Sequence, residues 1–230
     1  MAPLPLLHVT PHELVVCKPP GLASELPRDP RADSLLTRLG ADGYDDLRLV
    51  HRLDAPACGV MIVARSAAAA AHYAAEIEAR RWKKIYIAEV AAAEDRAQSL
   101  IGDHKAYLAI DGKRATVVRS GGKPSFLTIA HAAPASGPGR SHLLVRLHTG
   151  RFHQIRVMLA NLGAPLAGDT LYGGPGSDTI YLEHVLLAAR LFNAAASSVW
   201  RAPEHAERPA WSSSLAEAVK IEEASLLREA

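Results

Sequence analysis

A short apolar run at residues 60–64, which follows a charged step, constrains the fold of this chain more than any other feature. The run is continuous and rich in β-branched side chains, which is typical of a buried strand. The residues before it, HRLDAPAC, place Asp54 at the entrance to that strand. A carboxylate at such a border is costly unless it is paired or faces a cleft, because an apolar interior does not solvate charge. Asp54 is therefore a candidate functional residue.

The composition is that of a globular protein with one substantial domain. The chain has 230 residues, of which 49% are hydrophobic and 22% charged, and this balance excludes the disordered and fibrous classes. No stretch is apolar for long enough to cross a bilayer, and the start of the chain has neither a basic segment nor a clear cleavage site. The two cysteines, Cys17 and Cys58, make no disulfide framework. We therefore expect a reduced, cytoplasmic protein without a signal peptide.

Positive charge is concentrated in the middle of the chain. The formal net charge is only +2, but residues 101–160 contain nine lysines and arginines against two aspartates. A basic segment on a mildly acidic body can form one positive face suited to phosphates. The same pattern also fits an ordinary solvated surface, and charge alone does not separate the two interpretations.

Many short strands are predicted along the chain. Hydrophobic patterning indicates them at residues 14–17, 60–66, 83–90, 107–110, 116–118, 125–131 and 141–148. Residues 184–192 are apolar throughout, so periodicity does not decide between strand and helix there. Residues 91–124 are poorly patterned and are interpreted as a variable excursion.

A few helices are predicted between these strands. One begins after an N-cap at Ser34 and ends at Gly40, and a second begins after Ser66 and runs to about residue 81. A third runs from residue 152 to Gly163, and the last covers 212–230, with Ser214 and Glu217 as a capping box. This order of elements predicts an α+β fold, a mixed sheet flanked by helices in one domain over residues 1–230.

Other kinds of chemistry find little support. His142, His148 and His153 lie near one another in sequence, but no HExxH pattern is present and no cysteine or carboxylate stands at ligand spacing, so we expect no metal site. Cys58 could be the nucleophile of a cysteine hydrolase, but no local signature supports that role. A lone cysteine beside a glycine is usually a small apolar core residue. Neither a dinucleotide fingerprint nor a Walker phosphate loop is present.

Two residues distant from Asp54 are its candidate companions. Tyr86 is a polar aromatic residue on a strand that is otherwise apolar and acidic, and Arg156 borders the apolar stripe of the helix FHQIRVML. The three residues could have unrelated structural roles, or they could meet in one cleft.

Four motifs in one order resemble those of the RluA-type pseudouridine synthases. LVVCKPPGL is similar to the family's (V/I)-x-N-K-P-x-G-L start, and HRLDAPACG to its HRLDxxTSG motif. KKIYIAEV resembles the K-x-Y-x-A-x-V strand, and TGRFHQIRVMLANLGAPLAGDTLYGG resembles the segment TGRxHQIRxHLxxxGHPIxGDxxYG. One HRLD alone would be a weak signal, but four ordered motifs over residues 14–174 make a specific one.

The resemblance implies a fold and a chemistry. The fold is the pseudouridine synthase catalytic fold, with a mostly antiparallel sheet and a central RNA-binding cleft, here without the small RNA-binding module that precedes it in larger relatives. Asp54 would act on the sugar of a flipped-out uridine, either as nucleophile at the anomeric carbon or as base at carbon 2′. Tyr86 would stack on the base, and Arg156 would pair with the catalytic carboxylate. The reaction needs no cofactor and no metal.

The resemblance also implies how RNA is held. The substrate-binding residues would be His51, Arg52, Arg151, His153, Gln154 and Ile155. The expected partner is a stem-loop of transfer RNA or ribosomal RNA, and we expect a monomer without membrane contact. The basic segment 101–160 then becomes the phosphate-binding face.

The chain departs from the family pattern at five positions. Ala57 and Cys58 replace the Thr-Ser of the HRLD motif, Met158 and Ala164 replace two histidines, and Cys17 replaces an asparagine. None of these departures removes the candidate catalytic residues. They motivate the alternative that the chain is an RNA-binding protein of the same fold with reduced catalysis.

Overall fold

The computed structural model describes residues 3–25, 32–176 and 179–230, and the chain forms two compact units. Unit 1 consists of Met1–Lys83, Glu183–Pro203 and Leu226–Ala230, and unit 2 consists of Lys84–Leu182 and Glu204–Ser225. Both units are thus assembled from segments that are far apart in sequence. That the whole chain acts as one catalytic domain stays a prediction.

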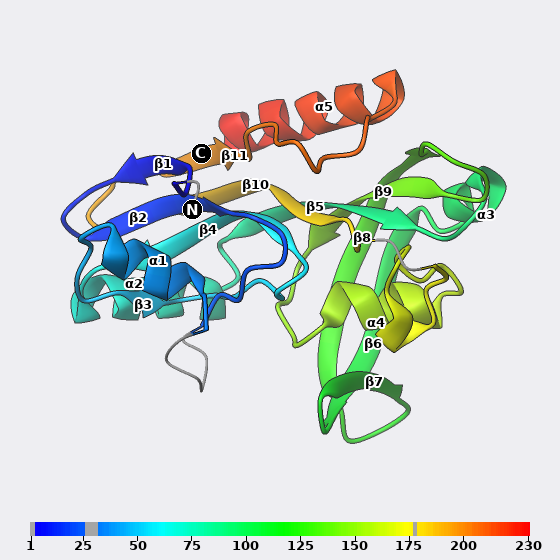
Figure 1. The fold of residues 1–230 in the computed structure, drawn as a ribbon, viewed down its shortest axis with the longest axis horizontal. Coiled ribbons are helices and arrows are strands. Elements are labelled where there is room, and N and C mark those ends of the chain that lie inside the picture. Colours follow the sequence, from blue (N-terminus) through cyan, green and yellow to red (C-terminus); the bar gives the residue numbers. More distant parts are fainter. Residues whose placement is uncertain (1–2, 26–31, 177–178) are drawn as a thin grey trace. The chain divides into compact units, whose positions relative to one another are not determined.

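Unit 1 is built on a sheet whose central strand is β4 (Figure 1). β4 pairs antiparallel with the whole length of β2 and, at its end, with β3, and it pairs parallel with β10. β1 continues the sheet beyond β2, and β11 pairs antiparallel with β10. The strands of this unit are β1 (Leu6–Val9), β2 (Glu13–Lys18), β3 (Arg48–Leu49), β4 (Cys58–Ala64), β10 (Leu182–Arg190) and β11 (Ser197–Arg201).

The parallel contact between β4 and β10 depends on Gly59. The backbones approach so closely that a Cβ at Gly59 would lie 2.3 Å from the carbonyl oxygen of His184. The residue also has a φ of +112°, which side chains other than glycine rarely adopt. The glycine that follows the HRLD motif therefore fixes where β4 meets β10.

Two capped helices complete unit 1. α1 (Leu35–Ala41) begins with a capping box in which Ser34 and Thr37 each accept a backbone N–H, and the Ser66 side chain caps α2 (Ala67–Glu78). From α2, Tyr73 packs into the apolar core with Trp82 and the strand residues Val60 and Ile62.

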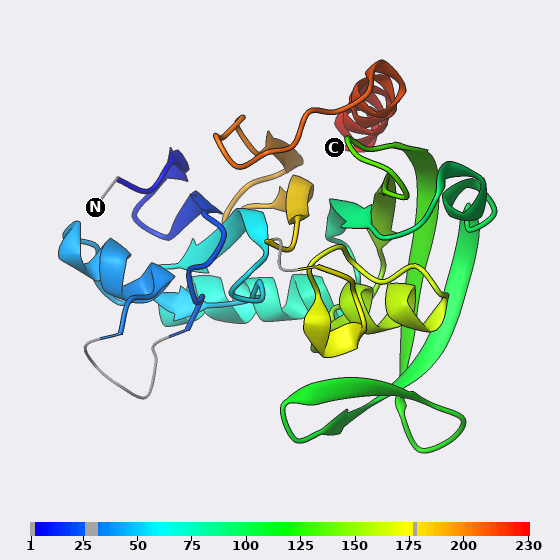
Figure 2. The same ribbon diagram turned by 45° about the vertical axis from the view of Figure 1, so that its right-hand side comes forward.

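Unit 2 is an antiparallel sheet in the order β5-β9-β8-β6-β7, in which β6 and β7 form a hairpin (Figure 2). α3 packs on β8 and β9, and α4 packs on β7. The strands are β5 (Lys83–Val90), β6 (Gly102–Asp111), β7 (Arg114–Val118), β8 (Lys123–Pro134) and β9 (Ser141–Leu147). The helices are α3 (Glu94–Gln98), α4 (Gln154–Asn161), the 3-10 turn η1 (Thr170–Tyr172) and α5 (Ser213–Glu229), the last residues of which belong to unit 1.

The predicted fold class, α+β with mixed and mostly antiparallel strands, is confirmed. The apolar residues 184–192 belong largely to a strand, β10, and the excursion at 91–124 is regular, since it contains α3, β6 and β7. The capping prediction at the last helix is wrong. Ser212, not Ser214, accepts the N–H of Leu215, because the helix begins at Ser213, two residues earlier than the capping box requires. In the described residues, no helix combines the length and the apolar character that a membrane crossing requires.

Candidate active site

Asp54 lies in a turn of unit 1 that is anchored on both sides. The N–H of Ala57 donates to the carbonyl oxygen of Asp54 at 3.0 Å and closes the turn. Before it, the backbone of Leu53 is held by Ser24, whose hydroxyl donates to the carbonyl at 2.7 Å and accepts the N–H at 3.2 Å. After it, the carbonyl of Ala55 accepts from the ammonium of Lys18 at 3.1 Å. These hydrogen bonds therefore hold the backbone on both sides of the half-buried Asp54 in one conformation.

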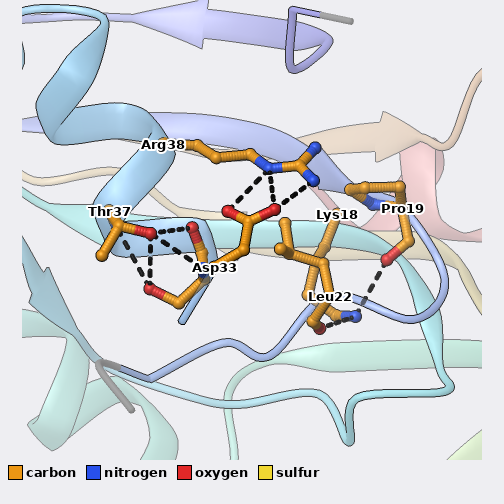
Figure 3. Close-up of polar contacts among 7 residues, drawn as sticks. Lys18, Pro19, Leu22, Asp33, Thr37 and Arg38 are labelled. Carbon is orange, nitrogen blue, oxygen red and sulfur yellow. Dashed lines mark hydrogen bonds and ion pairs between the residues drawn. The ribbon is translucent and has the colours of Figure 1, made fainter. Parts of the chain in front are cut away.

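Lys18 is a buried cation with three acceptors. Its Nζ donates to the carbonyls of Pro19, Leu22 and Ala55 at 3.0, 2.7 and 3.1 Å, and Figure 3 shows the first two of these contacts. An ammonium has three N–H donors, so this arrangement uses all of them. Burial lowers the pKa of Lys18 to about 8, although the nearby Cys58 and Asp54 favour its charged form. The KPPGL segment thus supports the Asp54 turn.

The two residues before Leu53 differ in environment. His51 is half-buried, and its Nε2 accepts the N–H of Ile62 in β4 at 2.9 Å, while its ring lies edge-on to Trp82 at 5.0 Å. The His51 ring therefore stabilises β4 through a hydrogen bond to its backbone. Arg52 is exposed and forms an ion pair with Glu25. Of the two, Arg52 presents its charge to solvent.

Tyr86 and Lys84 share one face of β5 in unit 2, because alternate residues of a strand point the same way. Tyr86 is buried and stands opposite Val145 of β9. Lys84 has no hydrogen bond or ion pair with any residue in the described ranges, and burial alone lowers its pKa to about 8. Its ammonium lies against Gly150, 3.4 Å from where a Cβ would stand. A cation held this way is suited to an anion from outside the protein.

Arg156 in α4 is held by a buried carboxylate. Its Nε and Nη2 donate to the two oxygens of Asp169 at 2.7 and 2.8 Å, and both side chains are almost completely buried. Its Nη1 donates to Nε2 of His153 at 3.0 Å. Because an arginine N–H can only donate, Nε2 must accept, which places the ring proton of His153 on Nδ1. The guanidinium orientation is therefore fixed by two neighbours.

Tyr172 connects this cluster to the β6–β7 hairpin. Its hydroxyl oxygen accepts from Nδ1 of His153 and from the N–H of Ala115, both at 2.8 Å. Its ring lies 5.2 Å from the guanidinium carbon of Arg156, and burial is the main cause of its raised pKa. The chain just after Tyr172 requires a glycine at position 174, because a Cβ there would lie 2.0 Å from the carbonyl oxygen of Leu166.

The other residues predicted to bind substrate lie at the start of α4. Arg151 is exposed, whereas Gln154 and Ile155 are buried. The Gln154 side chain accepts from the Arg151 N–H at 3.0 Å and donates to the carbonyl of Phe126 at 3.1 Å, so it holds the turn in place. His153 starts the helix in the left-handed conformation, with a φ of 51°.

The histidines considered as metal ligands have separate partners. His142 is buried beside Glu89, and the pKa of Glu89 is lowered chiefly by that histidine. His148 is exposed and contacts Thr128, and His153 contacts Arg156. Across the described ranges, no group of three or more His, Cys, Asp or Glu residues is placed to hold a metal ion.

The roles of Asp54, Tyr86 and Arg156 stay a prediction from the sequence, and sequence reasoning did not single out the residues that hold or accompany them. Asp54 belongs to unit 1, while Tyr86 and Arg156 belong to unit 2. The missed residues are Lys18, Lys84, Asp169 and Tyr172. Each occupies a defined position of a motif quoted above, the K of K-P-x-G-L, the K of K-x-Y, and the D and Y of GDxxYG, so the signal was present.

A family model described as RNA pseudouridylate synthase matches residues 12–161. The chain belongs to this family. It is therefore an isomerase that acts on uridine in RNA, and the resemblance to the RluA type is confirmed.

Related pseudouridine synthases match most of the chain. The dual-specificity RNA pseudouridine synthase RluA of Salmonella typhi is 32% identical over 189 residues, 82% of each chain. YhcT of Bacillus subtilis, an uncharacterized RNA pseudouridine synthase, is 32% identical over 74% of this chain and 58% of its own. Among solved structures, human RNA Pseudouridylate Synthase Domain Containing 1 aligns with a TM-score of 0.72 over 94% of both chains, at 21% identity. This last likeness concerns the fold.

The five departures from the family pattern all lie in the interior of this pseudouridine synthase. Ala57, Cys58, Met158, Ala164 and Cys17 are each less than a tenth exposed. Each places an apolar or thiol side chain where the family has a polar one, in surroundings that favour the less polar residue. None of the five is Asp54, Tyr86 or Arg156.

Proposed function

We propose that this enzyme converts uridines of transfer RNA or ribosomal RNA to pseudouridine with Asp54 as the group that acts on the sugar. The observation that carries the proposal is the Asp54 turn, anchored by Ser24 on one side and Lys18 on the other. Catalytic groups need a fixed orientation toward the reacting atom, and a doubly anchored backbone supplies it.

The reaction exchanges one glycosidic bond for another. The bond from carbon 1′ to N1 of uracil breaks, the base rotates, and carbon 1′ bonds to carbon 5, which then loses its proton while N1 gains one. Uracil can leave as a stabilised anion and stays bound, so the reaction does not need the second carboxylate with which a glycosidase protonates its leaving group. One carboxylate suffices, as nucleophile at carbon 1′ or as base at carbon 2′. No atom is exchanged with a cofactor.

The base must be extruded before this chemistry can occur, because a stacked nucleotide hides both reacting carbons. Tyr86 is proposed to stack on the flipped base and to assist the removal of the proton from carbon 5. Arg156 is proposed to favour the ionised form of the catalytic carboxylate. Its own pairing with Asp169 supports this role, because the guanidinium is already oriented.

RNA would be held by two exposed arginines, by the partly buried Lys84, and by the residues that position the turns around them. Arg52 and Arg151 are exposed, and Lys84 has no protein partner in the described ranges, so we assign these three to phosphates. His153 is proposed to contact RNA beside Arg156. His51, Gln154 and Ile155 would contribute by positioning the turns that carry these side chains.

The finer substrate assignment rests on the relatives. One is named a dual-specificity RNA pseudouridine synthase, and another, from Pseudomonas aeruginosa, a ribosomal large subunit pseudouridine synthase. We propose a stem-loop of transfer RNA or ribosomal RNA as substrate and a cytoplasmic monomer as the working form.

The test is tritium release from RNA labelled at carbon 5 of uridine, with separate transfer RNA and ribosomal RNA pools. The wild type should release tritium from at least one pool, and Asp54→Asn should lower the rate by at least about a hundredfold. Asp45→Asn, at an exposed carboxylate nearby, is the matched control and should retain the rate.

Equal rates for Asp54→Asn and the wild type would disprove the catalytic assignment. Tight, salt-dependent RNA binding by the wild type without tritium release from any pool would favour an RNA-binding protein with reduced catalysis.

A further inference from the structure

One face of the unit 2 sheet carries two aromatic rings and a lysine on adjacent strands. Lys105 on β6 stands directly opposite Phe126 on β8, and Tyr107 lies two residues further along β6. Opposed residues of antiparallel strands, and alternate residues of one strand, point to the same side. Lys105, Tyr107 and Phe126 therefore share a face, which we call the outer patch.

The lysine of the outer patch lies between its two rings. The ammonium of Lys105 is 5.2 Å from the ring centroid of Tyr107 and 5.5 Å from that of Phe126. It forms no ion pair with any residue that the structure describes. Its positive charge is thus available to an external anion, while both rings hold it in position.

The outer patch is open to solvent, unlike the opposite side of the same strands. Tyr107 is 38% exposed, which is unusual for an aromatic ring in the middle of a strand. The neighbouring residue Leu108 points the other way and is buried, as is Leu127 on β8. Lys105 is exposed and Phe126 is half-buried, so the outer patch is not part of the core of unit 2.

Hydrogen-bonding groups border the outer patch on the same face. The hydroxyl of Thr128 donates to Asp103 at 2.6 Å and contacts Nε2 of the exposed His148 at 2.8 Å. Thr128 stands opposite Asp103 and lies two residues from Phe126. A ligand that covers the rings would reach acceptors and donors at this border.

We propose that the outer patch binds a single-stranded segment of RNA, with bases stacked on Tyr107 and Phe126 and a phosphate at Lys105. Sheet faces with exposed aromatic residues and interleaved cations suit unpaired nucleotides, because every base offers a flat ring and every linkage a negative charge. Exposed cations at the ends of these strands, Lys113, Arg119 and Lys123, add charge complementarity. The inference rests on the proposed function in one respect, that the strand bound belongs to the substrate beyond the uridine that reacts.

The test is direct binding of a fluorescent uridine 12-mer to the full chain, measured by anisotropy at several salt concentrations. Tyr107→Ala should raise the dissociation constant about tenfold or more, since stacking of a base on an aromatic ring is lost. Tyr107→Phe keeps the ring and should bind as the wild type does. Lys105→Gln should weaken binding and reduce the salt slope by about 0.7, the value of one phosphate contact on a single strand.

The matched control is Lys220→Gln, which removes an exposed lysine of α5 and should change neither affinity nor slope. Circular dichroism and thermal unfolding verify that all variants are folded. Failure of the wild type to bind the 12-mer, or equal dissociation constants for Tyr107→Ala, Lys105→Gln and Lys220→Gln, would overturn the inference and leave a protein partner as the occupant.

Turnover separates this inference from the proposed function. On RNA with unpaired flanks, Tyr107→Ala should raise KM and leave kcat unchanged, because the outer patch is proposed to contact only nucleotides that do not react. If no RNA releases tritium while the 12-mer results hold, the proposed function fails and the binding surface stands. If tritium is released but the variants bind like the wild type, only the binding surface fails.

Discussion

Three residues of this enzyme show how a few buried side chains can fix the orientation of two proposed catalytic groups. Ser24 and Lys18 hold the backbone on either side of Asp54, and Asp169 holds the guanidinium of Arg156. These supports are buried, so their contacts are not weakened by competition with water. Their loss should cost both stability and orientation.

Asp169→Asn tests the support of Arg156. The substitution leaves a buried guanidinium facing a neutral amide, so the free energy of unfolding should fall by about 3 kcal/mol, as when one partner of a buried ion pair is removed. Urea denaturation measures this loss. Asp33→Asn is the control, because Asp33 pairs with Arg38 near the surface (Figure 3) and its loss should cost under about 1 kcal/mol. Equal losses for the two variants would contradict a buried, structurally important pair.

Lys18 gives the Asp54 turn a dependence on pH. The pKa of Lys18 is lowered to about 8, so above that pH the amine has two donors for three carbonyls. The anchor at Ala55 should weaken and kcat should fall as the pH rises through about 8. Stability should not follow, because the unfolded chain keeps its lysine protonated to a higher pH and linkage then favours the folded form.

A pH profile of kcat beside urea denaturation at each pH makes this comparison. Lys18→Met should have a low kcat that no longer depends on this ionisation, whereas Lys84→Met should retain the fall above about pH 8. A fall that persists unchanged in Lys18→Met would rule out Lys18 as its origin.

At the scale of elements, the β6–β7 hairpin is tied to α4 through one hydroxyl. Tyr172 accepts from Ala115 in β7 and from His153 at the start of α4, and its ring packs against Arg156. Tyr172 therefore adds a hydrogen-bonded link between the hairpin and the residues around Arg156 to the packing of α4 on β7.

Tyr172→Phe should weaken the connection between the β6–β7 hairpin and α4. It removes both hydrogen bonds while retaining the ring, and it should lower the free energy of unfolding by about 1–3 kcal/mol, because the buried N–H of Ala115 loses its acceptor. Hydrogen exchange should be faster at Ala115, while the amides of β4 in unit 1 serve as the internal control. Unchanged exchange at Ala115 would show that the hydroxyl does not hold the hairpin.

The elements predicted from sequence were those with local signals. β4 and α2 were found because a β-branched run and an N-cap serine are each decided by a few neighbouring residues. β10 could not be assigned, since it is buried on both faces and shows no alternation. The start of α5 was predicted to within one residue, but its cap was assigned to Ser214 because Ser212 and Ser214 are equivalent as local signals, and only the structure shows which one is used.

At the scale of the whole molecule, motifs in the sequence were enough to name the proposed catalytic residues, whereas their supports required coordinates. The pairing of Arg156 with Asp169 joins positions 13 residues apart within one motif, and the anchoring of Ala55 by Lys18 joins two different motifs. Neither follows from spacing, since nothing in a sequence states which buried charge meets which acceptor. The outer patch was invisible for the same reason, because it needs the register of β6 against β8.

The parallel pairing of β4 with β10 has a consequence for how the protein folds during its synthesis on the ribosome. Residues 58–59, beside the Asp54 turn, gain that neighbour only when residues 183–184 have been synthesised, long after β2 and β4 have emerged. The antiparallel pair of β2 and β4 can form early, whereas contacts of such high sequence separation form late. The nascent chain therefore carries the Asp54 turn beside an unfinished sheet edge until β10 has been synthesised, so we expect the ability to act on RNA to arise only after that point.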